Sequence, residues 1–286
     1  MSRLDIHKTY KLYIGGKFPR TESGRYFPIT DKKANVIANM CLASRKDFRN
    51  AVVVARNSQN AWASTSALNK GQILYRIAEM LEGRKEQFIK EIENQGSTRK
   101  RAIKEVEAAI DRLVYYAGWS DKYQQIFSAV NPVSSAHFNF SAPEPMGVVS
   151  IIAPEEHGLL GLVSAVAPAL VGGNTVVVLA SGTLPLCSIS FAEVLHSSDV
   201  PAGVVNILTG DKKELIPHMA SHMDVNAIIY CGKDADEIKK ISQLSSNNLK
   251  RNIFYKKTDW FNEHTQSPYF IEKTQEIKTT WHPTKI

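Results

Sequence analysis

Four short apolar runs, separated by segments of helical periodicity, constrain the fold of this chain more than any other feature. The runs are Gly147–Ala153, Asn174–Leu179, Val204–Thr209 and Ala227–Cys231. Each is almost continuously apolar, as expected for a strand buried on both faces of a parallel sheet. Helical patterns over Leu159–Leu170, Leu184–Ser197 and Lys213–Ser221 separate them. This alternation predicts an α/β fold with a doubly wound parallel sheet.

Helical spacing of apolar residues also dominates the segment before the first run. It predicts a helix from Asp47 with Ser44 as its N-cap, then helices over Asn69–Gly83, Phe88–Asn94 and Lys100–Gln125, with Gly96 as a helix stop. Tyr10–Ile14 and the residues after Arg20 read as short strands joined by turns. A largely helical N-terminal part therefore precedes the sheet.

Further strands, one helix and one loop are expected outside the four apolar runs. His137–Ser141 reads as a strand that Pro143 and Pro145 end. After the fourth apolar run, a helix over Asp234–Ser246, a strand over Asn252–Tyr255 and a loop over Thr258–Pro268 are expected. The second half of Phe270–Trp281 reads as a terminal strand.

Composition excludes several classes of protein. The 286 residues suit one large domain or two small ones, and 43% hydrophobic with 22% charged residues is ordinary for a soluble globular protein. The apolar runs are shorter than a membrane span, and Met1–His7 lacks the apolar core of a signal peptide. Cys41, Cys187 and Cys231 form no metal motif and suit a reducing compartment. We therefore expect a cytoplasmic protein that does not bind membranes.

The net charge of +7 is spread along the chain. Arg99–Arg101 precedes Lys104 and Glu105, a mixture typical of a solvated helix face. Lys250-Arg251 and Lys256-Lys257 bracket a short apolar run and suggest a basic strand edge. No aromatic-rich basic module is present, so we expect no nucleic-acid binding.

Five stretches resemble the NAD(P)-dependent aldehyde dehydrogenase superfamily. They are Tyr13–Phe18, Tyr115–Trp119, Pro143–Val149, Ala167–Val178 and Pro201–Gly210. The resemblance implies the Rossmann-like N-terminal domain of that superfamily, with a small β oligomerisation flap. It places the NAD-binding-like domain at residues 1–130 and 146–252, and the flap and C-terminal tail at 131–145 and 253–286.

The resemblance stops where the family's catalytic domain would begin. The Glu-Leu-Gly-Gly-Lys motif of the general base does not occur, and no cysteine follows such a motif. The organisation is similar to the non-catalytic second half of the two-domain (family 16) aldehyde dehydrogenases, with the catalytic domain absent. We therefore assign no catalytic residue.

Ligands of doubly wound sheets bind at the carboxyl ends of the strands. The loops expected there are Pro154–Gly158, Ala180–Thr183, Gly210–Lys213 and Gly232–Asp236. By resemblance, the first loop is Pro-Trp-Asn-Phe-Pro in the family, and its Asn stabilises an oxyanion. Glu156 stands at that position here, and an ionised carboxylate would repel an oxyanion.

Two further loops also differ from the family at the positions that bind the cofactor. The family's Lys-Pro-(Ser/Ala)-Glu, which holds the adenosine ribose, corresponds to Leu179–Gly182, and its Phe-Thr-Gly-Ser corresponds to Tyr230–Lys233. Asp234, Asp236 and Glu237 then place negative charge where a phosphate would bind. The resemblance leaves a degenerate cofactor site with weak or no NAD(P) binding, made of Ala153, Pro154, Glu156, Leu179, Ser181, Gly182, Gly210, Gly232 and Lys233.

The remaining polar candidates have simpler interpretations. Cys231 reads as a core residue, and Glu155, Glu156 and His157 read as solvated residues of one exposed loop. His218 and His222 share a helix face but have no third ligand nearby, so no metal is expected.

Three functions remain open from the sequence. The leading hypothesis is a non-catalytic subunit that assembles with a full-length aldehyde dehydrogenase, or with itself, through Ala136–Ser141 and Glu276–Trp281. The alternatives are an active NAD-dependent aldehyde oxidoreductase and a nucleotide-binding module.

Overall fold

A computed structural model describes residues 6–284 of the chain. The expectation that no signal peptide is present rests mainly on Met1–Asp5, which lie outside the described residues, as do residues 285–286 of the predicted tail. None of the helices within 6–284 combines the length and the apolar character needed to cross a membrane.

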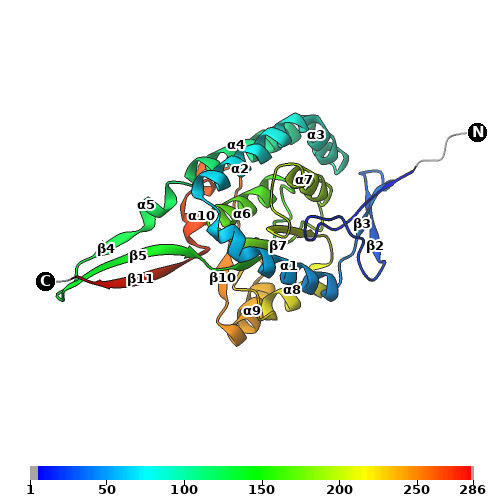
Figure 1. The fold of residues 1–286 in the computed structure, drawn as a ribbon. Coiled ribbons are helices and arrows are strands. Elements are labelled where there is room, and N and C mark those ends of the chain that lie inside the picture. Colours follow the sequence, from blue (N-terminus) through cyan, green and yellow to red (C-terminus); the bar gives the residue numbers. More distant parts are fainter. Residues whose placement is uncertain (1–5, 285–286) are drawn as a thin grey trace, which may run out of the picture.

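A five-stranded parallel sheet forms the centre of the molecule (Figure 1). Its strands are β6 (Val148–Ile152), β7 (Thr175–Leu179), β8 (Val205–Leu208), β9 (Ala227–Tyr230) and β10 (Arg251–Phe254). The order is β10-β9-β6-β7-β8, so the chain reverses direction across the sheet between β6 and β9. Every residue of β6 to β9 is buried. The predicted doubly wound sheet is confirmed.

Helices cover both faces of this sheet (Figure 1). One face packs against α1 (Arg45–Ser64), α8 (Lys212–Ser221) and α9 (Ala235–Ser245). The other face is covered by α2 (Ala67–Gly83), α3 (Lys85–Asn94), α4 (Arg99–Trp119), α6 (Leu160–Val171) and α7 (Leu186–His196). Successive residues of β6 point to opposite faces, so Val148 and Ile152 join the first core and Val149 and Ile151 the second.

The helix that was expected over Lys100–Gln125 is two helices. α4 ends at Trp119, where the Ser120 hydroxyl donates to the carbonyl of Ala117 at 2.8 Å, and α5 (Tyr123–Phe127) begins after a turn. A side chain that satisfies a last-turn carbonyl favours the end of a helix. The predicted stop at Gly96 is confirmed, since α3 ends before it and its φ of 102° suits only glycine.

An N-terminal sheet that the sequence showed only in part packs at one end of the molecule (Figure 1). Its order is β1-β3-β2, from β1 (Lys8–Tyr10), β3 (Val36–Cys41) and β2 (Tyr26–Thr30). β3 was not expected, yet it is the central strand. Tyr13, which follows β1, pairs with Ile207 of β8. This contact attaches β1, β2, β3 and the loops between them, here called the N-terminal arm, to the edge of the central sheet.

A second three-stranded sheet, here called the flap, projects from the opposite end (Figure 1). It consists of β4 (Ala129–Asn131), β5 (His137–Pro145) and β11 (Gln275–Pro283), in the order β11-β5-β4, and α10 (Tyr269–Glu272) precedes β11. The expectation that Pro143 and Pro145 end β5 is wrong. Pairing with β4 stops at Ser141, so the rest of β5 is an edge on that side, where proline is tolerated.

Candidate functional site

The carboxyl edge of the central sheet carries two hollows beside the loop that follows β6. One, of 310 Å³, lies near the strand-order reversal and is lined by Pro154, Glu156, Gly232 and Lys233, among others. The other, of 390 Å³, is lined by Gly182, Gly210 and residues of the α8 start. The structure thus brings most of the sequence-predicted cofactor residues to one edge, as the topology requires.

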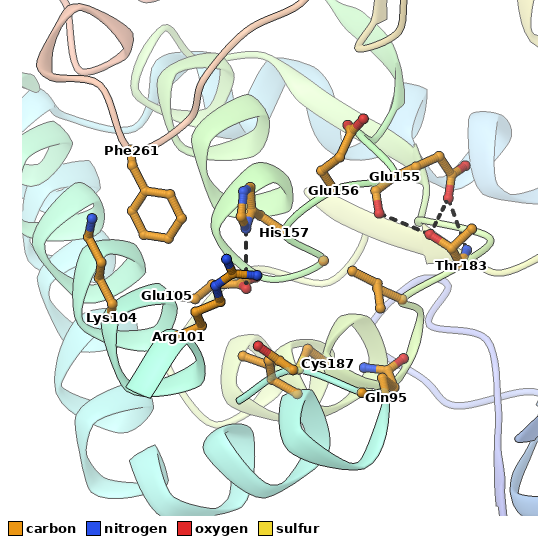
Figure 2. Close-up of a pocket in the computed structure, with 15 residues that line it drawn as sticks. Gln95, Arg101, Lys104, Glu105, Glu155, Glu156, His157, Thr183, Cys187 and Phe261 are labelled. Carbon is orange, nitrogen blue, oxygen red and sulfur yellow. Dashed lines mark hydrogen bonds and ion pairs between the residues drawn. The ribbon is translucent and has the colours of Figure 1, made fainter. Parts of the chain in front are cut away.

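The side chain of Glu155 closes part of this edge (Figure 2). Its Oε2 accepts hydrogen bonds from the Ser181 hydroxyl and from the Thr183 amide, both at 2.9 Å. Its Oε1 lies 2.6 Å from Nζ of Lys212. The expectation that Glu155 is solvated is therefore wrong, because one carboxylate joins the loops that follow β6, β7 and β8.

The charge of Glu155 is fixed by these contacts. Burial acts to raise the pKa of Glu155, but the hydrogen bond and the positive charge of Lys212 outweigh burial, and the pKa is lowered. The carboxylate is ionised at neutral pH. It already binds the hydrogen-bond donors that a ligand at this edge would need. A second anion at the same place would meet its repulsion.

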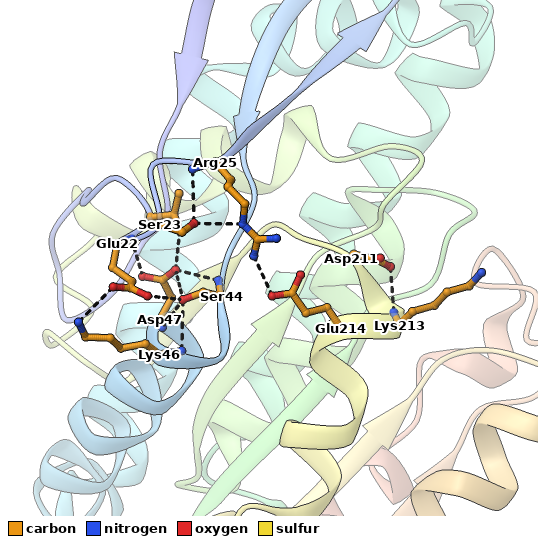
Figure 3. A network of polar contacts seen from close by, with 10 residues as sticks. Glu22, Ser23, Arg25, Ser44, Lys46, Asp47, Asp211, Lys213 and Glu214 are labelled. Atoms are coloured by element: carbon orange, nitrogen blue, oxygen red, sulfur yellow. Dashed lines mark hydrogen bonds and ion pairs between the residues drawn. The ribbon is translucent and has the colours of Figure 1, made fainter.

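The N-terminal arm contacts the first turn of α8 (Figure 3). Asp211 caps the helix by accepting the Lys213 amide at 2.9 Å. In the same first turn of α8, Oε1 of Glu214 lies 2.8 Å from Nη2 of Arg25, which belongs to the arm. Arg25, far away in sequence, thus contacts the same helix turn that carries Lys212.

The N-terminus of α9 is also occupied by protein groups. Asp234 Oδ1 accepts the amides of Asp236 at 2.9 Å and Glu237 at 3.1 Å. Tyr230 donates its hydroxyl to Glu237, and burial raises the pKa of Tyr230, so the hydroxyl keeps its proton. The amides that could bind a phosphate at this helix start already have a carboxylate acceptor.

Two of the predicted cofactor residues do not face the edge. Leu179 is fully buried in the sheet core, and Ala153 is buried while its amide donates to the Leu179 carbonyl at 2.9 Å. The side chains of Ala153 and Leu179 pack inside the core. The prediction that they belong to a cofactor site is therefore wrong as far as the side chains are concerned. Gly210 is also buried, and a Cβ added there would lie 3.1 Å from Leu215.

The structure contains a larger cavity that the sequence did not indicate. It has a volume of 720 Å³ and lies between α4, the loop after β6 and Phe261 (Figure 2). His157 lines it with a left-handed backbone φ of 60°, and its Nδ1 lies 3.5 Å from Oε2 of Glu105. The expectation that His157 is merely solvated is wrong, since its ring also meets the edge of Phe261 with centroids 4.8 Å apart.

Glu105 is a buried carboxylate that the sequence analysis missed. Its Oε1 accepts the backbone amides of Leu159 at 3.0 Å and Leu160 at 3.3 Å, at the start of α6. Negative charge at a helix N-terminus is favourable. The spacing of Glu105, Ala109 and Arg112 places all three on one buried helix face. This helical spacing is the sequence signal that could have identified Glu105 as buried.

The buried cysteines do not form a nucleophilic centre. Cys187 lines the large cavity, but burial, reinforced by the nearby Glu91 and Glu105 carboxylates, raises the pKa of its thiol. Burial likewise raises the pKa of Cys231. A thiol is a weak nucleophile until it ionises, so neither of these two thiols is activated.

The sheet order and the ligand edge are those of a dinucleotide-binding type of α/β protein. Comparison with protein families narrows the class: a model described as the aldehyde dehydrogenase family matches residues 20–254. This chain belongs to the aldehyde dehydrogenase family.

Individual relatives agree with this assignment. A cytosolic 10-formyltetrahydrofolate dehydrogenase of Mus musculus is 32% identical over 241 residues, which are 81% of this chain and 26% of that protein. A putative aldehyde dehydrogenase, DhaS, of Bacillus subtilis is 30% identical over 252 residues, or 86% of this chain and 50% of the relative. The chain spans half or less of the length of these curated relatives.

A solved structure gives the same result for the fold. The NAD+ complex of an aldehyde dehydrogenase from Bacillus cereus superposes with a TM-score of 0.82 at 25% sequence identity. The match covers 87% of this chain and 51% of that one. The Rossmann-like fold of the family is therefore present here.

Proposed function

We propose that this chain is a non-catalytic, aldehyde dehydrogenase-like subunit that assembles with a full-length NAD(P)-dependent aldehyde dehydrogenase through its flap. The observation that carries the proposal is the flap itself. β5 pairs with β11 along its whole length, from His137 opposite Pro283 to Pro145 opposite Gln275. This sheet projects away from the core instead of packing on it (Figure 1).

The surface of the flap is apolar where a partner would bind. Phe138, Ile277 and Trp281 are each about half exposed, and Val130 is 68% exposed. A hollow of 440 Å³ beside β4 is lined by Val130, Phe138 and Phe140, among others. Phe138 and Val130 lie on one face of the flap, and Ile277 and Trp281 lie on the other. Exposed apolar side chains on both faces, next to unpaired strand edges, are a liability in a monomer and are typical of an interface.

The proposed lack of catalysis rests on the sheet edge. Glu155 holds Lys212, Ser181 and Thr183, and Asp234 caps α9. A dinucleotide would have to displace internal carboxylates that already satisfy these donors, and both phosphates would meet negative charge. We infer that the chain binds NAD(P) weakly or not at all and contributes structure to an assembly.

Coexpression with a full-length aldehyde dehydrogenase from the same source tests the proposal. Size-exclusion chromatography with light scattering should show one complex that contains both chains. Ile277→Asp together with Trp281→Asp should abolish it, because two charges would be buried in an apolar contact. Tyr75→Asp on the outer face of α2, also about half exposed, is the matched control and should leave the complex intact.

Three results would refute this function. One is a chain that stays monomeric beside the partner. Another is a complex that survives the double flap substitution. The third is NADH formation by the chain alone with NAD and a panel of aldehydes, which would establish an oxidoreductase instead.

A further inference from the structure

Cations occur along the whole chain, but their excess over carboxylates is concentrated near its start. Residues 6–60 contain eleven Lys and Arg residues and three Asp and Glu residues. Since the formal net charge of the whole chain is +7, the rest of the chain is close to neutral. A charge distribution of this kind favours contact with an acidic partner.

The three carboxylates of residues 6–60 are all engaged inside the fold (Figure 3 shows two of them). Asp47 is 4% exposed and accepts the Thr21 hydroxyl at 2.6 Å. Asp31 accepts two backbone amides of its own turn. Glu22 pairs with Lys46 at 3.1 Å. These carboxylates are therefore not available to neutralise the other cations of the segment.

The outer side of α1 carries two cations without a partner. Arg45 and Arg49 are both exposed and lie one turn apart on the helix. Lys46 pairs with Glu22, and Arg56 donates to the carbonyl of Asp224 at 2.7 Å. Within residues 6–284, by contrast, neither Arg45 nor Arg49 forms an ion pair with a carboxylate.

The neighbouring helix α8 does not neutralise this charge. Burial lowers the pKa of His218 on α8, and the charge of Arg45 lowers that pKa further, so this cation lies close enough to act on α8. Glu214 acts on His218 in the opposite direction, but its carboxylate is already paired with Arg25 at 2.8 Å. The unpaired charge between α1 and α8 is therefore positive.

A loop of the N-terminal arm extends the positive charge beyond the helix. Lys17 and Arg20 are exposed, and the same loop packs on α1, since a Cβ added at Gly15 would lie 3.1 Å from Val54. Val53, which is 48% exposed, lies one turn from Arg49 and adds an apolar point to this surface. We call the surface made of Lys17, Arg20, Arg45, Arg49 and Val53 the basic face.

We propose that the basic face binds an acidic segment of a partner protein, with carboxylates against Arg45 and Arg49 and an apolar side chain against Val53. Complementary charge favours such a segment. A second copy of this chain is a poor occupant, because two basic faces would repel each other and the rest of the chain is close to neutral. This surface goes beyond the assembly role proposed above and does not depend on it.

Fluorescence anisotropy with a labelled peptide tests the surface directly. The peptide consists of three repeats of Glu-Glu-Leu-Glu-Glu, and its Kd for the purified chain should lie below about 100 μM at about 50 mM salt. The same peptide with Gln in place of every Glu should bind at least tenfold more weakly. Affinity for the acidic peptide should fall at least fivefold at about 300 mM salt, because the contacts are exposed and are screened.

The double variant Arg45→Gln, Arg49→Gln should lose at least fivefold in affinity for the acidic peptide, because two charge-assisted contacts are removed. Lys239→Gln with Lys240→Gln is the matched control, since both lysines are exposed on α9 and the change in net charge is the same. This control should lose less than twofold. Thermal unfolding of both double variants checks that they fold.

Val53→Ser tests the apolar part of the surface. It should weaken binding of the leucine-containing peptide about threefold and leave binding of an all-glutamate peptide of equal length unchanged, because only the former has an apolar side chain to bury. Equal losses for the two peptides would remove Val53 from the surface and overturn the proposed geometry.

Several other results would overturn the proposal as a whole. They are no binding of the acidic peptide at about 50 mM salt up to about 1 mM, equal binding of the Gln peptide, and equal loss in the two double variants. A duplex oligonucleotide of the same charge that bound more tightly than the peptide would assign the face to nucleic acid instead. None of these results bears on complex formation through the flap.

Discussion

Nζ of Lys212 lies 2.6 Å from Oε1 of Glu155, and the contact joins the loop after β6 to the first turn of α8. The two side chains are 18% and 30% exposed, so the pair is largely shielded from solvent. Ser181 and Thr183 bind the other oxygen of the same carboxylate. One side chain from the loop after β6 thus closes the edge where the family fold would receive a dinucleotide.

Replacement of Glu155 by Gln should increase the affinity for NAD by roughly tenfold, because the repulsion is removed and Lys212 is released toward the phosphates. Titration calorimetry at constant ionic strength measures the change. Glu263→Gln, at an exposed acidic position, is the control and should bind NAD with the same affinity as the wild type. Equal NAD affinity in the wild type and Glu155→Gln would mean that this carboxylate does not control the edge.

Arg112 connects α4 to the segment between β10 and α10. It is 3% exposed, and its guanidinium donates to the carbonyls of Thr265 at 2.8 Å and Trp260 at 2.9 Å. It also donates to the hydroxyl of Ser164 at 2.8 Å. Burial lowers the pKa of Arg112, yet the several acceptors around it hold the group in place.

Arg112→Lys should reduce the free energy of unfolding by about 3–5 kcal/mol, because an ammonium cannot reach acceptors in several directions and leaves buried carbonyls unpaired. Urea unfolding followed by circular dichroism measures the loss. Arg76→Lys, at an exposed position on α2, should change stability by less than about 0.5 kcal/mol. A loss below about 1 kcal/mol for Arg112→Lys would show that the network contributes little.

The fold could be predicted because its signal is local. Each residue of Thr175–Leu179 and of Val148–Ile152 is apolar or small and lies in a fully buried strand, and hydrophobic runs of this kind require no knowledge of distant partners. β3 was not predicted, because Asn39 interrupts the apolar residues of Val36–Cys41. Pairing with two neighbouring strands stabilises it instead.

The candidate site could be predicted only as a set of loops. Glu155 appeared solvated in sequence because its partners Ser181 and Thr183 are 26 and 28 residues away. Lys250 appeared to belong to a basic surface, yet it is 6% exposed. In both cases a charged residue follows directly in the chain, and the decisive contacts come from elements that only the folded sheet brings together.

The predicted N-cap Ser44 is confirmed, and it is one part of a larger network (Figure 3). Its hydroxyl accepts the amides of Lys46 and Asp47, while Asp47 accepts the Ser44 amide at 2.8 Å. Asp47 also accepts the Thr21 hydroxyl at 2.6 Å, which attaches the N-terminal arm to α1.

Ser44→Ala should lower the free energy of unfolding by about 1 kcal/mol, the usual cost of losing an N-cap. Asp47→Ala should cost more, about 2–3 kcal/mol, because the buried amide of Ser44 and the hydroxyl of Thr21 both lose their acceptor. Chemical denaturation of the two variants provides the comparison. Ser66→Ala, which removes the single cap bond of α2 to Asn69, is the control for an isolated cap. The ranking fails if Asp47→Ala costs no more than Ser66→Ala.

Lys250 should make stability depend on pH in the alkaline range. Its Nζ donates to the carbonyls of His222 at 2.7 Å and Val225 at 2.8 Å, and burial lowers its pKa from 10.5 to about 8. Between these two values the unfolded chain binds more protons than the folded chain, so this residue adds stability as pH rises. The raised pKa of Cys187 and of Cys231 acts in the opposite direction.

A comparison with Lys250→Met therefore isolates the effect, since the cysteines are common to both proteins. The free energy of unfolding of the wild type, minus that of Lys250→Met, should increase by about 1–2 kcal/mol between pH 8 and pH 9.5. Urea unfolding at both pH values measures it. The same difference for the exposed Lys239→Met should stay constant. A constant difference for Lys250→Met would show that its ammonium titrates as it does in the unfolded chain.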